Sequence, residues 1–298
     1  MLKGTYVFKQ NGIEVGRSEN VVTTTGKLAI LKYIANPANE WASMLAVGAI
    51  GTSEAITDQT LYYEIARSPV TLKSYAIVDS APDIIIVKGT IDSSVVGNIY
   101  EVGVYPLMTS QTFGVRDQLI IDDFSTTSNW TGSTFTTNAF APSTIYSNRI
   151  GSYSINLSSG STITRNNLSL NLSTYSTLDT LDILVNVASA GSGTLSVTLT
   201  DVNGVSTSAF PSPASSFGGN TGYQIISIPL PSAIFNMSTI TSMSITTTGL
   251  AITLDAIRIS TKSEITDSTS LVSRSTLTTP IGKILGVPLD IEYYLQIG

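Results

Sequence analysis

The sequence contains no histidine and no cysteine, so its carboxylates are the main candidates for acid–base chemistry or metal binding. That composition excludes Ser-His-Asp triads, thiol nucleophiles and thiolate or imidazole metal sites. Two adjacent carboxylates, Asp122 and Asp123, end the apolar run Leu119-Ile120-Ile121, and a third, Asp255, lies in the segment ITLDAIRIS. Carboxylate oxygens of this kind suit a hard cation such as calcium, which takes about 6–8 oxygen ligands.

A glycosidase would need two carboxyl groups beside a cleft, one of them with a raised pKa. Asp179 and Asp182 are the nearest approach to such a pair, but they lie in TLDTLDILV, at the entry to an expected strand. We therefore expect that the protein is not an enzyme and name no catalytic residue.

Length and charge narrow the class of protein further. At 298 residues the chain can form two ordinary domains or one large β domain, and its net charge of −6 argues against a nucleic-acid partner. The start MLKGTYVFKQNG lacks the apolar run of a signal peptide. No stretch approaches the roughly 18 apolar residues of a membrane span. We expect a protein made in the cytoplasm that does not insert into membranes.

Charged residues divide the chain into three zones. Residues 119–260 contain no lysine and no glutamate, whereas both occur before this zone and return after it, from Lys262 onward. A change of composition that reverses itself indicates one domain inserted into another. We expect a discontinuous base domain of residues 1–116 plus 262–298 and an inserted domain of residues 117–261.

The residue patterns predict a mainly β protein. Asn11-Gly12 between two alternating runs predicts a β-hairpin. A helix is expected in TTTGKLAILKYIANP, with Leu28, Ile30, Leu31 and Ile34 on one face and Pro37 ending it. In the middle zone, short strands separated by turn signals such as SSGS and VNGV predict an antiparallel β-sandwich or jelly roll. The base domain is therefore expected to be a small α+β domain with one helix, interrupted by the sandwich.

The outer segments resemble a small β domain found in tail-fibre, baseplate and other accessory proteins of phage virions. The residues that carry the resemblance are Gly48, Gly51, Asp58, Leu61, Glu64, Arg67, Glu101-Val102-Gly103-Val104-Tyr105, Arg274, Lys283 and Tyr293. The resemblance covers about half the chain, and its closing segment appears only after the middle zone. It implies a virion protein that contacts other virion proteins and forms a homo-oligomer, with a trimer as the first expectation.

Glu64 and Arg67 are close enough in sequence to form an ion pair. One interpretation is that their loop contacts a neighbouring subunit. The other is a surface ion pair, which contributes little energy.

The middle zone resembles the jelly roll of carbohydrate-binding modules. The resemblance rests on Asp122-Asp123-Phe124 with Trp130 at its start, and on Ile252-Thr253-Leu254-Asp255-Ala256-Ile257-Arg258-Ile259 at its end. First and last strands of a jelly roll are neighbours, so Asp122 or Asp123 is expected near Asp255, and the family carries a structural calcium ion there. Ser125 replaces the family's glutamate. Alternatively, the aspartates solvate a strand end and accept backbone N–H groups.

Sugar binding requires exposed aromatic rings with polar side chains beside them. Tyr146, Asn148 and Arg149 form a polar-aromatic loop, and Tyr223 follows a glycine-rich turn. These four are the candidate glycan-binding residues. For Trp130 we favour core packing beside Phe124.

Taken together, these patterns predict a non-enzymatic phage virion protein whose base domain docks to the particle. Its jelly roll would project outward as part of a tail or baseplate fibre and touch host surface polysaccharide. The alternative within the virion is a capsid decoration or cement protein that stabilises the head. A third alternative is a secreted carbohydrate-binding accessory protein, against which the missing signal peptide counts.

Overall fold

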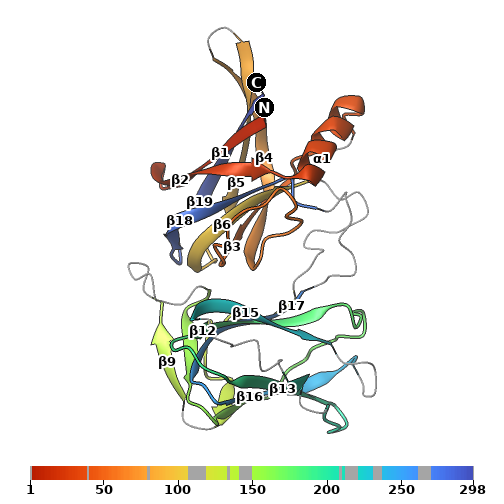
Figure 1. The fold of residues 1–298 in the computed structure, drawn as a ribbon, viewed down its shortest axis with the longest axis vertical. Helices are drawn as coiled ribbons and strands as arrows, with labels where there is room; N and C mark the ends of the chain where they lie inside the picture. The colour runs from red at the N-terminus through yellow and green to blue at the C-terminus, as the bar shows by residue number, and fades with distance from the viewer. Residues whose placement is uncertain are drawn as a thin grey trace. The chain divides into compact units, whose positions relative to one another are not determined.

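The computed structural model describes residues 2–38, 40–78, 81–106, 119–132, 135–140, 150–207, 210–211, 221–230, 237–260 and 270–297. The chain divides into two compact units. The first, called the barrel unit, comprises Met1–Val115, Pro142–Arg149 and Ile265–Gly298. The second, called the sandwich unit, comprises Arg116–Ala141 and Ile150–Glu264 (Figure 1). As predicted, the protein is mainly β and its described part contains one helix.

The barrel unit is a closed sheet of eight strands in the order β1-β19-β5-β4-β3-β6-β18-β2. Their bounds are β1 Leu2–Gln10, β2 Ile13–Val22, β3 Met44–Gly48, β4 Glu64–Val78, β5 Ala81–Ile91, β6 Gly97–Tyr105, β18 Ser273–Lys283 and β19 Leu289–Ile297. Every described pair of neighbours is antiparallel. Its core contains the stacked rings of Tyr6 and Tyr293, whose centroids are 4.6 Å apart.

The predicted hairpin and helix both form. Asn11 and Gly12 have φ values of 51° and 78°, the left-handed pair that a tight two-residue hairpin turn requires. The helix, α1, spans Thr24–Ala35, and the Thr23 side chain caps it by accepting from Gly26 N at 2.9 Å. A Cβ atom on Gly26 would lie 1.9 Å from the carbonyl oxygen of Val272, so only glycine lets the helix approach β18 this closely.

Two antiparallel sheets form the sandwich unit. The first has the order β15-β12-β17-β10-β9, with β7 paired to β17, and the second has the order β14-β13-β16-β11-β8. Their bounds are β7 Leu119–Asp122, β8 Trp130–Gly132, β9 Phe135–Ala139, β10 Tyr153–Leu157, β11 Thr162–Arg165, β12 Thr180–Val187, β13 Thr194–Asp201, β14 Phe210–Pro211, β15 Gly222–Pro229, β16 Ile240–Thr248 and β17 Ile252–Ser260. Inward-facing Leu, Ile and Val from both sheets fill one core, consistent with the predicted jelly roll.

The two ends of the middle segment lie close together in each unit. In the barrel unit β6 pairs with β18, and Val104 lies opposite Ser273. In the sandwich unit β7 pairs with β17, and Leu119 lies opposite Ile259. The chain therefore leaves and re-enters the barrel at adjacent strands, and the first and last strands of the sandwich are neighbours, as the jelly-roll expectation required.

Candidate functional site

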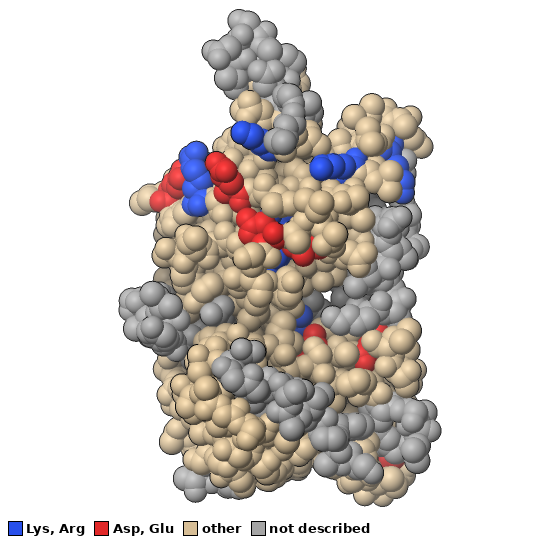
Figure 2. All heavy atoms as spheres, in the orientation of Figure 1, with Lys and Arg blue, Asp and Glu red and all other residues tan. Residues whose placement is uncertain are grey.

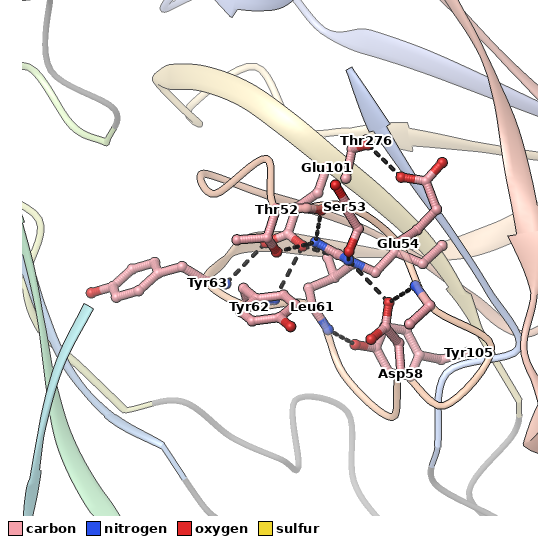
Figure 3. Close-up of polar contacts among 12 residues, drawn as sticks. Thr52, Ser53, Glu54, Asp58, Leu61, Tyr62, Tyr63, Glu101, Tyr105 and Thr276 are labelled. Atoms are coloured by element: carbon pink, nitrogen blue, oxygen red, sulfur yellow. Dashed lines mark hydrogen bonds and ion pairs between the residues drawn. The ribbon is translucent and has the colours of Figure 1, made fainter. Parts of the chain in front are cut away.

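A buried polar cluster surrounds Arg274 of β18 (Figure 3). This side chain is fully buried and lies between two carboxylates from distant parts of the chain. Its Nη2 is 2.9 Å from Oε2 of Glu101, and its Nη1 is 3.0 Å from Oδ2 of Asp58. The remaining Nη2 contacts go to the carbonyl and hydroxyl of Thr52, both at 3.1 Å.

Glu101 also holds the loop between β3 and β4. Its carboxylate accepts hydrogen bonds from Tyr62 N at 3.1 Å and from Tyr63 N at 2.9 Å. Nearby, the hydroxyl of Tyr105 accepts from Leu61 N at 2.9 Å. Burial raises the pKa of Glu101, while the Arg274 guanidinium and the backbone donors lower it. Both carboxylate oxygens and the guanidinium have partners, and through them this cluster anchors the β3–β4 loop.

The ion pair expected between Glu64 and Arg67 forms with two contacts of 2.7 Å. It is not a surface pair, because only 14% of the Arg67 side chain and 11% of the Glu64 side chain are exposed. The guanidinium lies 4.1 Å from the centre of the Tyr105 ring. The pair therefore packs within the barrel against Tyr105, and a contact of Glu64 and Arg67 with a neighbouring subunit stays a prediction.

A second charged cluster lies on β1, β5 and β19. Glu292 accepts from Lys88 at 2.6 Å and from Lys9 at 2.9 Å, and Tyr294 donates to the same carboxylate at 2.5 Å. Burial raises the pKa of Glu292, but these hydrogen bonds outweigh it and lower the pKa to about 2. The carboxylate therefore stays ionised over almost the whole pH range.

In the sandwich unit, Asp122 is buried at the end of β7. Its Oδ1 accepts from Phe124 N at 2.7 Å, and its Oδ2 accepts from the Trp130 indole at 2.8 Å and from Arg165 at 2.5 Å. Burial raises the pKa of Asp122, and the Phe124 and Arg165 contacts oppose that shift. Trp130 packs against Phe124 in the core, as expected, with the ring centroids 5.6 Å apart.

The other two candidate calcium ligands have partners of their own. Asp123 is a turn residue whose carboxylate accepts from the backbone N–H of Ser125 at 2.9 Å. Asp255 is fully buried and accepts from Ile150 N at 3.3 Å. Across the described ranges, no group of three or more His, Cys, Asp or Glu side chains is arranged to hold a metal ion. Calcium binding by Asp122, Asp123 and Asp255 stays a prediction.

Of the four candidate glycan-binding residues, Tyr223 alone lies in the described part of the chain. It is half-buried on β15, directly opposite Asn186 of β12. Tyr146, Asn148 and Arg149 lie outside the described residues.

The outward face of the second sheet carries only hydroxyl side chains at its alternate positions on three adjacent strands. They are Thr194, Ser196, Thr198 and Thr200 of β13, Ser242, Ser244, Thr246 and Thr248 of β16, and Thr162 and Thr164 of β11. Facing hydroxyls bond one another across the strands, for example Thr162 with Thr246 and Thr164 with Ser244, both at 2.8 Å. This uncharged array, called the hydroxyl face, was not singled out from the sequence, although strict Ser/Thr alternation in TLSVTLTD was its signal.

In the described residues, no helix is long and apolar enough to cross a bilayer.

No family model matches this sequence, and no curated protein does. Similar solved structures include a family 11 carbohydrate-binding module from Clostridium thermocellum in complex with a β-1,3-1,4-mixed-linked tetrasaccharide (13% identity, TM-score 0.33, 48% of this chain and 95% of that chain). Another is the C-terminal family 6 module of LamC from Zobellia galactanivorans (12% identity, TM-score 0.30, 48% and 99%). A third is tailspike protein 4 of bacteriophage CBA120 (15% identity, TM-score 0.30, 46% and 20%).

Proposed function

We propose that this protein is a non-enzymatic structural component of a bacteriophage virion. Its barrel unit docks to the particle and to further copies of itself, and its sandwich unit contacts host surface glycans. One observation carries the proposal. Three of the residues on which the resemblance to phage accessory domains rests, Asp58, Glu101 and Arg274, are far apart in sequence and meet in one buried cluster of the barrel unit. This cluster holds the β3–β4 loop through hydrogen bonds from Tyr62 and Tyr63 to Glu101.

Glycan contact is assigned to the sandwich unit because of its uncharged hydroxyl face and Tyr223 of β15. Hydroxyl groups both donate and accept hydrogen bonds, so such a face suits a neutral polysaccharide better than a charged partner. Contacts of this kind are weak singly, and several copies on one particle would make them effective through multivalency. Tyr223, Tyr146, Asn148 and Arg149 remain the candidate residues for stacking and orientation of the sugar.

The test combines particle imaging with glycan binding. Labelled antibodies viewed by electron microscopy should place the protein on the tail or baseplate. A glycan array should show binding by the wild type that Tyr146→Ala with Arg149→Ala, or Thr198→Val with Ser244→Ala, reduces at least several-fold. Thr136→Val, which removes a hydroxyl from the other sheet, is the matched control and should bind like the wild type.

Two outcomes would contradict the proposal. The first is a glycan array that shows no binding, antibody label on the head of the particle, and heads that are less stable to heat when the protein is absent. This result would indicate a capsid decoration or cement protein. Hydrolysis of a polysaccharide by the purified protein would contradict the non-enzymatic assignment.

A further inference from the structure

Two groups of exposed apolar side chains lie on the surface of the barrel unit. The first, called the α1 patch, consists of Leu28, Leu31 and Ile34, which are 39%, 62% and 70% exposed. The helix buries its other face through Gly26 and Ile30. The sequence pattern placed Leu28, Ile30, Leu31 and Ile34 on one helical face, and of these four only Ile30 is buried.

The second group, called the hairpin patch, joins two neighbouring turns. Ile13 and Val15 at the start of β2 are 70% and 42% exposed, and Ile284 and Leu285 after β18 are 38% and 69% exposed. The two turns are neighbours, because the Gln10 side chain donates to the carbonyl of Gly282 at 3.1 Å. Large exposed apolar groups that cluster in this way on a folded unit usually mark an interaction surface.

The charges around the two patches have opposite signs. Helix α1 carries Lys27 and Lys32 and no acidic residue. Around the hairpin patch lie Glu14, Glu19 and Asp92. The basic residues nearby are Arg17, which pairs with Glu14 at 3.1 Å, Lys9, which pairs with Glu292 at 2.9 Å, and the buried Lys283. The hydrogen bonds from Arg17 lower the pKa of Glu14, and those from Ser94 lower the pKa of Asp92, so both carboxylates are ionised at neutral pH.

The two patches face different directions. Figure 1 shows the β1–β2 turn on one side of the barrel unit and α1 on the opposite side. Figure 2 shows lysine and arginine atoms over α1, and acidic atoms with a group of basic atoms among them toward the β2 side of the same unit. Patches on opposite sides of one molecule cannot cover each other within that molecule, but each can cover the other on a neighbouring copy.

We propose that the α1 patch of one copy docks on the hairpin patch of the next, so that this protein self-associates head to tail. Apolar side chains would form the centre of the contact and the lysines and carboxylates its rim. Head-to-tail contacts of this type close into rings when the rotation between copies permits. An anionic lipid surface would attract α1 but repel the hairpin patch, which favours a second copy as the partner of both. The inference rests on the self-association in the proposed function and names its surfaces.

The test uses the full-length chain and two double variants, Leu31→Glu with Ile34→Glu, and Ile13→Glu with Leu285→Glu. Multi-angle light scattering and sedimentation velocity should give a wild-type mass of several chains, and each double variant alone should be monomeric. An equimolar mixture of the two variants retains one intact contact, so its mass should stop at two chains. Leu178→Glu, at a site 68% exposed in the sandwich unit, is the control and should assemble like the wild type. Circular dichroism should show that all variants are folded.

Several results would overturn the inference. A monomeric wild type over the whole concentration range would do so, as would a hairpin variant that assembles normally while the α1 variant does not, since that would indicate a symmetric α1–α1 contact. Binding of the wild type to phosphatidylserine vesicles, lost in the α1 variant, would indicate a membrane partner instead. A monomer that is still found on the tail and still binds glycans would overturn this inference and leave the proposed function standing.

Discussion

At the scale of residues, several buried charges in the described part of this protein have specific partners. Arg274, Glu101 and Asp58 come from three segments more than 40 positions apart in sequence and fix the loop between β3 and β4. In the sequence, Glu101 was a single charge within the apolar run IYEVGVY. A lone carboxylate in such a run predicts a buried partner, but it does not identify Arg274, because only the closing of the barrel brings β18 beside β6.

Removing Arg274 should destabilise the barrel unit strongly. Arg274→Met leaves Glu101 buried without its partner, a change that costs about 3–5 kcal/mol in comparable buried pairs. The chain has two tryptophans, Trp41 in the barrel core and Trp130 in the sandwich core, so urea unfolding followed by fluorescence in a Trp130→Phe background reports the barrel alone.

Two variants control this measurement. Arg17→Met, which removes an exposed pair, should leave the unfolding midpoint almost unchanged. Adding Glu101→Gln to Arg274→Met should recover part of the lost stability, because it removes the uncompensated charge. If it recovers none, the buried charge is not the cause of the loss.

Glu292 should make the barrel unit sensitive to acid. Its pKa is lowered from 4.5 to about 2, so its ionised form stabilises the folded state. That contribution is complete above pH 4.5 and is lost as the pH falls toward 2. Glu292→Gln should therefore be less stable than the wild type at pH 7, and the difference should shrink to near zero at about pH 2. A difference that stays constant across this range would show that the ionised carboxylate is not what stabilises the fold.

At the scale of elements, the sequence predicted which segments form but not everything that they contact. The hairpin at Asn11-Gly12 and the helix capped by Thr23 follow from local backbone chemistry, and both are present. The buried face of α1 does not follow from apolar spacing, since the helix approaches β18 through Gly26 and leaves Leu31 and Ile34 exposed. Local sequence patterns show where the apolar residues are, but long-range contacts determine which of them are buried.

The β7–β8 turn offers a test of the calcium prediction. Asp122→Asn weakens the contacts with Trp130 and Arg165, and an unsatisfied buried group costs about 1–3 kcal/mol. Unfolding of the sandwich unit, followed by Trp130 fluorescence in a Trp41→Phe background, should show this loss equally with calcium and with a chelator, because both oxygens of Asp122 already have donors. A stabilisation by calcium that the variant lacks would instead support an ion at Asp122, Asp123 and Asp255.

At the scale of the whole molecule, the sequence predicted the insertion because lysine and glutamate are absent from residues 119–260. It also predicted that the first and last strands of the inserted unit are neighbours, which β7 and β17 are. The order of strands around the barrel could not be predicted, because it depends on pairings such as β1 with β19 between opposite ends of the chain. The hydroxyl face was missed for a similar reason, since only the register of three strands brings its side chains into one array.

The final prediction is that the barrel unit folds without the sandwich unit. The backbone N–H of Val272 donates a hydrogen bond of 2.8 Å to the carbonyl of Val104, so the two chain ends at the insertion lie close together. A short Gly-Ser linker from Pro106 to Ser270 can therefore replace residues 107–269, because closing so short a loop costs little entropy. The shortened protein should unfold cooperatively in urea. Its unfolding midpoint, followed by Trp41 fluorescence, should be close to that of the barrel unit in the intact chain.

A second variant is the matched control. Replacing the loop 52–60 by a linker removes Asp58 and the Thr52 contacts of Arg274, and should clearly lower the urea midpoint. A shortened chain without a cooperative transition would mean that the barrel depends on the inserted unit for its stability, and the two would then have to be regarded as one folding unit.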